Sequence, residues 1–304
     1  MQRLKDYSNC IKYAVKEDVL PSISLIGTKQ KTLLYKVFCH YVPNKERAYI
    51  INRIAYRYNI DKDISFLLET GMELIFAAYY LRDDLLDETP IIMGQKVDKS
   101  SAKSFSLLAD MLNEVGNIQI AKYCARIGKS LTDFISEGFL LLSYGQMQGL
   151  SNHIGIEEYF DVAYNKSGAM MEYALKMLLP LLPIDDGKVL VDFATDFGVS
   201  SQIRNDIEDY LKKDTNILFQ DLKTGQANFV LSVYFDKTKT SNLKENLANL
   251  DNVDEITNRL FNDICFAIQF LFALKGNMLN NLFMLHNKNC RKELEEITTN
   301  LISL

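Results

Sequence analysis

The feature that most constrains this chain is the spacing of its apolar residues, which follows a helical period with few interruptions. There are only five prolines in 304 residues, and proline is the strongest breaker of helices. Apolar residues recur near every 3.6 positions in the stretches 64–82, 117–147, 156–178, 188–211 and 252–287. We therefore expect an all-α protein. The stretch 117–147 forms one long helix or two, and Gly276 is the expected joint between a final pair of helices.

Nothing in the sequence divides the chain into domains. Hydrophobic residues make up 48% and charged residues 24%, an ordinary globular composition with enough apolar material for a large core. The chain shows no fixed-period repeat, no low-complexity tract and no proline- or serine-rich linker. We expect a single domain over residues 1–304, built as one large helical bundle.

Charge and cysteine content narrow the classes of function. The net charge of −5 argues against nucleic acid as a partner. The five cysteines are scattered, without a CxxC pair, as is typical of reduced thiols in a cytoplasmic protein. The N-terminal MQRLKDYSNC lacks the apolar region of a signal peptide, and no unbroken apolar run approaches the roughly 18 residues of a membrane span. Any membrane association is expected to be peripheral only.

An acidic cluster follows the first strongly apolar helix, in the stretch YYLRDDLLDE from Tyr79 to Glu88. Asp83 and Asp87 are four residues apart and share one face of a helix, with Asp84 at the edge of that face. Like charges at this spacing, at the negative pole of a helix, are unfavourable unless cations lie between them. Mg²⁺ takes such oxygen ligands together with substrate phosphates. Taken alone, the cluster is more simply a solvated helix end.

A second cluster of the same form stands later in the chain, in FGVSSQIRNDIEDYLKKD. Asn205 and Asp209 are again four residues apart, and Asp206 again lies beside the first member. Two helices that carry such clusters can hold several Mg²⁺ ions, which bind a diphosphate and neutralise its charge as it leaves. The pair of clusters therefore favours metal-dependent chemistry on a diphosphate.

Together with four short motifs, the two clusters resemble those of the isoprenyl diphosphate synthase, or polyprenyl synthetase, family. The motifs are YGQMQG (144–149), like a Gly-Gln motif; NKSGAM (165–170), like a Lys-Thr motif; FGVSSQIRND (197–206); and QDLKTGQANFVL (220–231). The resemblance covers most of the chain. It implies an isoprenoid-synthase helical bundle with a central active-site cavity, a homodimer, and a prenyltransferase, an enzyme that transfers alkyl groups other than methyl.

The same resemblance implies roles for individual residues. About three Mg²⁺ ions per site would be held by Asp83, Asp84, Asp87, Asn205, Asp206 and Asp209. The residues central to catalysis would be Asp83, Asp87, Lys166 and Asp206. The residues that bind substrate would be Arg82, Lys29, Tyr79, Gln146, Lys166, Gln202 and Lys213. Tyr79, helped by Phe76, would form the floor of the tunnel that holds the prenyl tail. Outside this context Lys166 is simply a solvated lysine, and Gln146 bonds between helices.

The chain departs from the family where chain-elongating members bind isopentenyl diphosphate with arginines from two motifs. In GTKQKTL (27–33) Lys29 is kept, but Gln30 and Thr32 stand in the places of arginines. Ile92 and Met93, anchored by Gly94, replace an Arg-Arg pair. None of these side chains gives the bidentate bonds of a guanidinium to phosphate. We expect the allylic site to be kept and the isopentenyl site to be lost.

One branch of the family has this character, the ComQ-type tryptophan prenyltransferases of bacterial quorum sensing. They transfer a geranyl or farnesyl group to a tryptophan of a pheromone precursor peptide, which implies such a peptide as partner here. The alternatives are a short-chain geranyl or farnesyl diphosphate synthase and a class I terpene cyclase. Asn205, Asp206 and Asp209 echo a cyclase motif, but residue 213 is lysine instead of glutamate. A non-enzymatic partner subunit would not need the aspartates.

Overall fold

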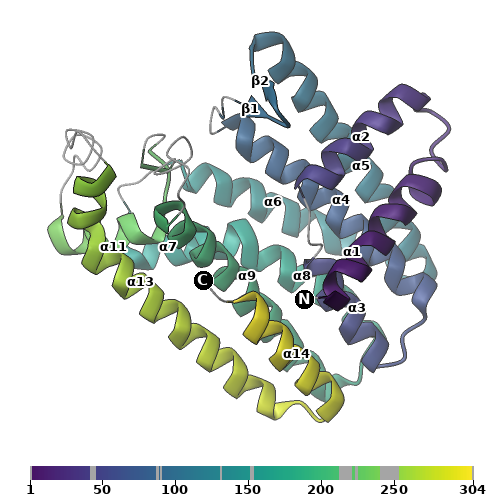
Figure 1. Ribbon diagram of the computed structural model, residues 1–304. Coiled ribbons are helices and arrows are strands. Elements are labelled where there is room, and N and C mark those ends of the chain that lie inside the picture. The colour runs from purple at the N-terminus through teal and green to yellow at the C-terminus, as the bar shows by residue number, and fades with distance from the viewer. Residues whose placement is uncertain are drawn as a thin grey trace. The chain divides into compact units, whose positions relative to one another are not determined.

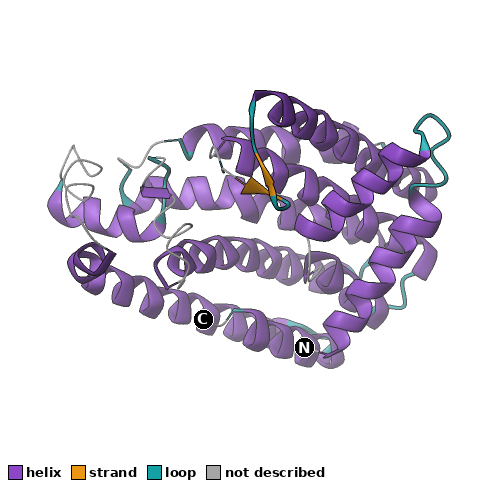
Figure 2. Cartoon of the chain, turned by 45° about the horizontal axis from the view of Figure 1, so that its top comes forward, coloured by secondary structure: helices purple, strands orange, loops and turns teal. Residues whose placement is uncertain are grey.

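The computed structural model describes residues 2–41, 46–86, 89, 91–130, 132–150, 154–211, 221–222, 225–239 and 253–302. These residues are almost entirely helical (Figures 1 and 2), which confirms the predicted all-α class. The chain divides into two compact units, Met1–Asp133 and Phe134–Leu304. The single domain expected over residues 1–304 stays a prediction, and each unit is described by itself.

The first unit consists of helices and one small hairpin. Its helices are α1 (Gln2–Ala14), α2 (Thr28–Tyr41), α3 (Glu46–Arg57), α4 (Lys62–Leu86) and α5 (Lys99–Ile127), with a π-helical turn, η1 (Val15–Val19), after α1. The hairpin pairs β1 (Ile91–Ile92) with β2 (Gln95–Lys96) in antiparallel register and is drawn in orange in Figure 2. Its two turn residues, Met93 and Gly94, have positive φ angles of 52° and 75°, as a two-residue hairpin turn requires.

Helix α4 is the central helix of the first unit and packs closely on α5. Two glycines allow the backbones to approach. A Cβ atom on Gly71 would lie 2.6 Å from Cδ1 of Ile120, and one on Gly116 would lie 2.6 Å from Cγ1 of Ile75. By length and composition alone, α4 is also apolar enough to cross a membrane, but 72% of its apolar window is buried inside the protein. Its position in the core accounts for its hydropathy.

The second unit is also helical. Its elements are α6 (Thr132–Gln148), α7 (Ile156–Ala163), the π-helical turn η2 (Tyr164–Gly168), α8 (Ala169–Leu178), the 3₁₀ turn η3 (Leu179–Leu181), α9 (Ile184–Leu211), α11 (Phe229–Thr238), α13 (Val253–Asn281), the 3₁₀ turn η4 (Leu282–Met284) and α14 (Lys288–Leu301). Helices α13 and α14 lie side by side (Figure 1). The ring of Phe229 lies 5.1 Å from that of Tyr159 and 5.2 Å from that of Phe270, which joins α7, α11 and α13.

Most of the helices expected from periodicity are present, with one difference, at Gly276. The stretch 117–147 contains two helices, because α5 ends at Gly128 in the left-handed conformation (φ 68°). Gly276 is not a joint, and that prediction was wrong. Helix α13 runs through Gly276 to Asn281, and the break follows at η4. A glycine in a helix interior weakens the helix by only about 1 kcal/mol, so packing can keep the helix intact. All five cysteines are free thiols.

Candidate active site

A π-helical turn in the second unit carries Lys166. This turn, η2, lies between α7 and α8, and such turns insert an extra residue into a helix, often at functional sites. Lys166 is half-buried, and its ammonium group lies over the end of α6. A Cβ atom on Gly149 would be 3.2 Å from both Cε and Nζ of Lys166. The absence of a side chain at Gly149 therefore leaves room for this cation at the end of α6.

Further glycines admit the backbone of the π-helical turn between α6 and α9. A Cβ atom on Gly145 would lie 2.6 Å from Cβ of Asn165, and one on Gly198 would lie 2.6 Å from the carbonyl oxygen of Ser167. Gly145 belongs to the YGQMQG stretch, and Gly198 follows Phe197 in the FGVSSQIRND stretch. These two motifs thus share one physical role, which is to let the segment around Lys166 pack closely on both sides.

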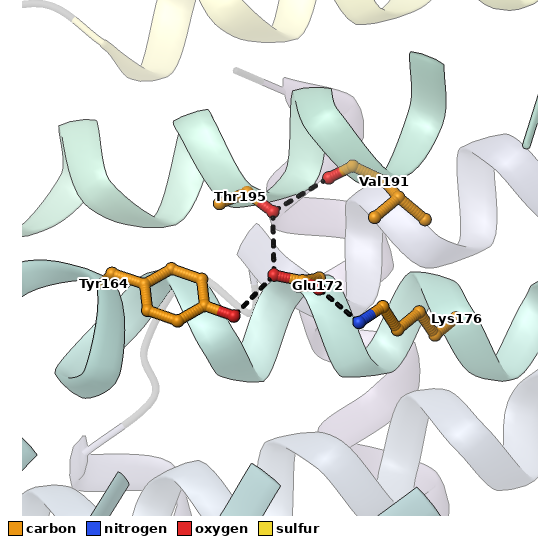
Figure 3. Close-up of polar contacts among 5 residues, drawn as sticks. All are labelled: Tyr164, Glu172, Lys176, Val191 and Thr195. Atoms are coloured by element: carbon orange, nitrogen blue, oxygen red, sulfur yellow. Dashed lines mark hydrogen bonds and ion pairs between the residues drawn. The ribbon is translucent and has the colours of Figure 1, made fainter. Parts of the chain in front are cut away.

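Glu172 on α8 also anchors the turn (Figure 3). The hydroxyl of Tyr164 donates to Oε2 of Glu172 at 2.8 Å, and Thr195 of α9 donates to the same oxygen at 3.4 Å. Lys176 pairs with the other carboxylate oxygen. Partial burial raises the pKa of Glu172, but the bonds from Lys176 and Tyr164 outweigh it and hold that pKa below its usual value. Glu172 is therefore ionised at neutral pH.

Asp206 of the second acidic cluster lies inside the second unit, with only 3% of the residue exposed. Its Oδ2 accepts hydrogen bonds from the hydroxyl of Tyr159 at 2.6 Å and from the backbone N–H of Phe229 at 2.7 Å. Its Oδ1 accepts from Nε2 of Gln202 at 2.9 Å. Burial, and then the nearby charge of Asp221, raise the pKa of Asp206 to about 7. Gln202 thus contacts Asp206 directly.

The other residues of this region differ in exposure. Asn205 is exposed, whereas Asp209, one turn later on α9, is buried. Gln146 is half-buried on α6, and the neighbouring Gln148 accepts a hydrogen bond from Nδ2 of Asn165 at 2.9 Å. Lys213 lies outside the described residues.

The first acidic cluster ends helix α4 in the first unit. Asp83 is half-buried. Asp84 is directed toward α2, where the hydroxyl of Tyr41 donates to its Oδ2 at 2.6 Å, and Thr89 donates to its Oδ1 at 3.3 Å. Burial raises the pKa of Asp84 above its usual value. Asp84 also lines a pocket of about 430 Å³ together with Lys99 at the start of α5. Asp87 lies outside the described residues.

Side chains just before this cluster leave α4 in two directions. Arg82 donates to Oδ1 of Asp110 on α5 at 2.7 Å, and its guanidinium lies 5.6 Å from the ring centre of Tyr79. Phe76 and Tyr80 instead lie under Arg47 of α3, at 4.1 and 5.4 Å. Phe76, predicted from sequence to help form the tunnel floor, thus also stacks on the guanidinium of Arg47. To contact a diphosphate as predicted, Arg82 would have to give up its ion pair with Asp110.

Two segments hold the residues that stand where the sequence resemblance leads us to expect arginines. Lys29, Gln30 and Thr32 are exposed in the first turns of α2, where Thr32 bonds to the carbonyl of Thr28 at 3.0 Å. Ile92 is buried in the hairpin, with 1% of the residue exposed.

Some, but not all, of the side chains in the two acidic clusters are suited to bind Mg²⁺. Within the part of the chain that the structure describes, no three His, Cys, Asp or Glu side chains form a metal-binding group by themselves. Asp83, Asn205 and Asp209 nevertheless offer the hard oxygen donors that Mg²⁺ takes, and this ion completes its shell with water and substrate phosphates. At Asp84 and Asp206, donors within the protein engage both carboxylate oxygens.

The sequence profile of the polyprenyl synthetase family matches residues 35–264. The chain belongs to the polyprenyl synthetase family. It is accordingly a prenyltransferase, an enzyme that transfers alkyl groups other than methyl. No curated protein matches the sequence.

Solved structures of polyprenyl synthetases share the fold. Geranylgeranyl pyrophosphate synthetase from Pyrococcus horikoshii Ot3 is 18% identical, with a TM-score of 0.80 over 100% of this chain and 98% of that one. A decaprenyl diphosphate synthase from Rhodobacter capsulatus is 15% identical, with a TM-score of 0.81 over 99% and 98%. A polyprenyl synthase from Caulobacter crescentus CB15, complexed with calcium and isoprenyl diphosphate, is 14% identical, with a TM-score of 0.79 over 100% and 97%. At these identities the likeness concerns the fold, and it confirms the expected isoprenoid-synthase bundle.

Sequence reasoning missed the residues that connect the motifs of this polyprenyl synthetase. Ser167 donates to Oε1 of Gln202 at 3.0 Å, and Asn228 donates to Oδ2 of Asp221 at 2.7 Å. Tyr159, which bonds to Asp206, lies on a helix to which no motif pointed. Only the polar residues of the matched motifs could have been found from sequence, because a tyrosine in an amphipathic helix carries no pattern of its own.

Proposed function

We propose that this prenyltransferase ionises geranyl or farnesyl diphosphate and transfers the prenyl group to a tryptophan of a pheromone precursor peptide. The observation that carries the proposal is the burial of Ile92, where chain-elongating relatives are expected to have an arginine. The side chain is enclosed in the hairpin with 1% of the residue exposed. An arginine there would bury an unpaired charge, at a cost of several kcal/mol. This position therefore provides no contact to isopentenyl diphosphate.

The neighbouring positions support the same proposal. Met93 is apolar and held in the hairpin turn with φ 52°, and Gln30 and Thr32 carry no charge on the exposed start of α2. Each missing hydrogen bond from a guanidinium to a phosphate weakens binding by about 1.5–3 kcal/mol. Loss of several such bonds would weaken the binding of isopentenyl diphosphate enough for a different prenyl acceptor to be preferred.

The groups expected to bind the allylic diphosphate are kept. The ammonium group of Lys166 lies next to Gly149, and we assign it to the diphosphate oxygens. Asp83, Asp87, Asn205 and Asp209 would hold Mg²⁺, which supplies charge neutralisation for the leaving diphosphate. Exclusion of water by apolar walls would protect the allylic cation until an indole ring attacks it. The final proton would pass to the released diphosphate or to a carboxylate. The protein is proposed to act in the cytoplasm as a homodimer.

Two reactions run in parallel test the proposal. The first supplies radiolabelled isopentenyl diphosphate with geranyl diphosphate, and the second supplies geranyl or farnesyl diphosphate with a tryptophan-containing peptide. We expect a prenylated peptide and little chain growth, and a peptide with phenylalanine in place of tryptophan should stay unmodified. Efficient formation of farnesyl diphosphate in the first reaction would refute the proposal. A cyclic hydrocarbon formed from the allylic diphosphate alone would instead indicate a terpene cyclase.

A short-chain isoprenyl diphosphate synthase is the second candidate. Lys29 is exposed at the start of α2, where the family's isopentenyl-binding motif is expected. Its ammonium group could still bind the diphosphate of isopentenyl diphosphate. The solved relatives named above are geranylgeranyl and longer-chain synthases. The first of the two reactions decides between this candidate and peptide prenylation.

A further inference from the structure

The carboxylate of Asp206 accepts a hydrogen bond from the first backbone N–H group of helix α11. The first N–H groups of a helix have no partner within it. Here the N–H of Phe229 donates to Oδ2 of Asp206 at 2.7 Å, and the N–H of Val230 donates to the side chain of Asn228 at 2.9 Å. The helix dipole also favours an anion at this end. Asp206 therefore joins α11 to α9 by a hydrogen bond.

Little of this carboxylate is left for a metal ion. A carboxylate offers about four lone-pair directions, and Tyr159, Phe229 and Gln202 occupy three of them. Mg²⁺ binds oxygen at about 2.0–2.1 Å and keeps several waters of its own. Only 3% of Asp206 is exposed, so a hydrated ion could reach its carboxylate only if one of these donors moved away. The preceding residue, Asn205, is exposed instead.

One chain of contacts leads from Asp206 to the π-helical turn through α9. The amide of Gln202 donates to Oδ1 of Asp206 at 2.9 Å and accepts from the hydroxyl of Ser167 at 3.0 Å. Ser167 is the residue next to Lys166. The orientation of the Gln202 amide is thus set by Asp206 at one end, and it fixes the turn at the other.

A second chain of contacts leads to the ammonium group itself. Two residues before Phe229, the N–H of Ala227 donates to the carbonyl of Gly149 at 2.8 Å. Gly149 is the residue over which Nζ of Lys166 lies. By holding Phe229, Asp206 also holds the segment that fixes the end of α6 beneath Lys166.

From these contacts we propose that Asp206 positions Lys166 and does not bind Mg²⁺. The proposal rests on the proposed function in one respect, since it takes Lys166 as the residue that binds the donor diphosphate. It leaves the exposed Asn205 as an oxygen donor of the second acidic cluster.

The first experiment counts metal ions. Calorimetry of inorganic pyrophosphate binding to the full chain, at a series of Mn²⁺ concentrations, gives the number of Mn²⁺ ions taken up with each pyrophosphate. In Asp206→Asn the side-chain oxygen still accepts hydrogen bonds, and Gln202 can rotate its amide to accept from the new NH₂ group. We expect this variant and the control Asp192→Asn, an exposed residue of α9, to take up as many Mn²⁺ ions as wild type. Asp83→Asn should take up fewer. A lower uptake by Asp206→Asn would overturn the proposal.

The second experiment tests the connection to Lys166. Asp206→Leu removes every acceptor, so pyrophosphate should bind about tenfold or more weakly with Mn²⁺ uptake unchanged. Lys166→Gln should weaken binding similarly, and the double variant should lose no more than the larger single loss, since the two residues act together. Additive losses would refute positioning. If Asp206→Leu does not fold, Tyr159→Phe replaces it, with a smaller loss in the same direction.

The two proposals fail in different ways. Wild-type pyrophosphate affinity in Lys166→Gln would refute the assigned role of Lys166 and, with it, the proposed function at this residue. Mn²⁺ uptake by Asp206→Asn does not depend on Lys166, and it still decides whether Asp206 is a metal ligand.

Discussion

Gly198 lies directly against the backbone of Ser167, so that a Cβ atom on Gly198 would be 2.6 Å from the carbonyl oxygen of Ser167 and 2.8 Å from Cα of Gly168. Real Cβ atoms do not approach backbone atoms this closely, and backbone atoms cannot turn aside as a flexible side chain can. The approach brings the π-helical turn that carries Lys166 onto α9. A glycine at this position is thus a requirement of packing as well as a feature of the family motif.

Replacement of this glycine should therefore be costly. We expect Gly198→Ala to lower the free energy of unfolding by about 2 kcal/mol or more, because the added methyl group overpacks a backbone contact. Gly276→Ala is the matched control, since nothing lies within 4 Å of a Cβ atom at this helical position. It should raise stability by about 0.5–1 kcal/mol. Urea unfolding followed by circular dichroism measures both. Equal effects of the two changes would contradict the packing argument.

Removal of the first-cluster carboxylate should abolish activity without unfolding the chain. Asp83 is half-buried at the end of α4 and is not part of the apolar core. We expect Asp83→Ala to lower prenyl transfer by at least about a hundredfold, because a metal ligand is lost, while the circular dichroism spectrum stays that of wild type. Turnover at the wild-type rate would show that Asp83 does not bind the metal.

The sequence allowed the helical class and the main motifs to be predicted, because period and spacing are local properties. It did not show what the motif residues contact. Asp84 and Asp206 match the metal-binding pattern as well as Asp83 does, yet the structure gives them Tyr41 and Tyr159 as donors. Both tyrosines are far away in sequence, so no local pattern could show that these carboxylates are engaged within the protein. The same holds for Gly276, where tertiary packing kept a helix that local propensity would interrupt.

Burial at Ile92 should exclude an arginine from the hairpin. We expect Ile92→Arg to lower the free energy of unfolding by about 3 kcal/mol, since it buries a charge and removes an apolar side chain. Ile91→Arg on the same strand, where the residue is 60% exposed, should change stability by no more than about 0.5 kcal/mol. Thermal unfolding of both variants is the measurement. If Ile92→Arg were as stable as wild type and gained chain elongation, the buried isoleucine would not explain acceptor choice.

A buried carboxyl in the first unit should make stability depend on pH. Glu69 accepts hydrogen bonds from Tyr7 at 2.5 Å and from Asn52 at 3.2 Å, and burial raises its pKa to about 7. The folded chain therefore holds a proton at Glu69 that the unfolded chain releases near pH 4.5. The stability that this group contributes is fully present below about pH 4.5 and is lost as pH rises through about 7.

The variant Glu69→Gln isolates this effect, because glutamine has no proton to lose. Between pH 4.5 and 8 we expect wild type to lose about 3 kcal/mol relative to Glu69→Gln, the free energy that corresponds to the shift in pKa. Urea unfolding at several pH values measures the difference. A constant difference between the two proteins across this range would show that Glu69 titrates at its ordinary pKa.

Tyr79 is expected to limit the length of the prenyl tail. It precedes Asp83 by four residues and so lies one turn, about 5–6 Å, deeper on the same face of α4. Cutting the ring to a methyl group in Tyr79→Ala should open space and raise the use of geranylgeranyl diphosphate relative to geranyl and farnesyl diphosphates. Competition among the three donors measures the preference. Tyr80→Ala is the matched control, because Tyr80 is directed toward Arg47 of α3 and its loss should leave donor preference as in wild type. If Tyr79→Ala stays active with wild-type preference, the tyrosine only packs against its neighbour Arg82, and the tunnel ends elsewhere.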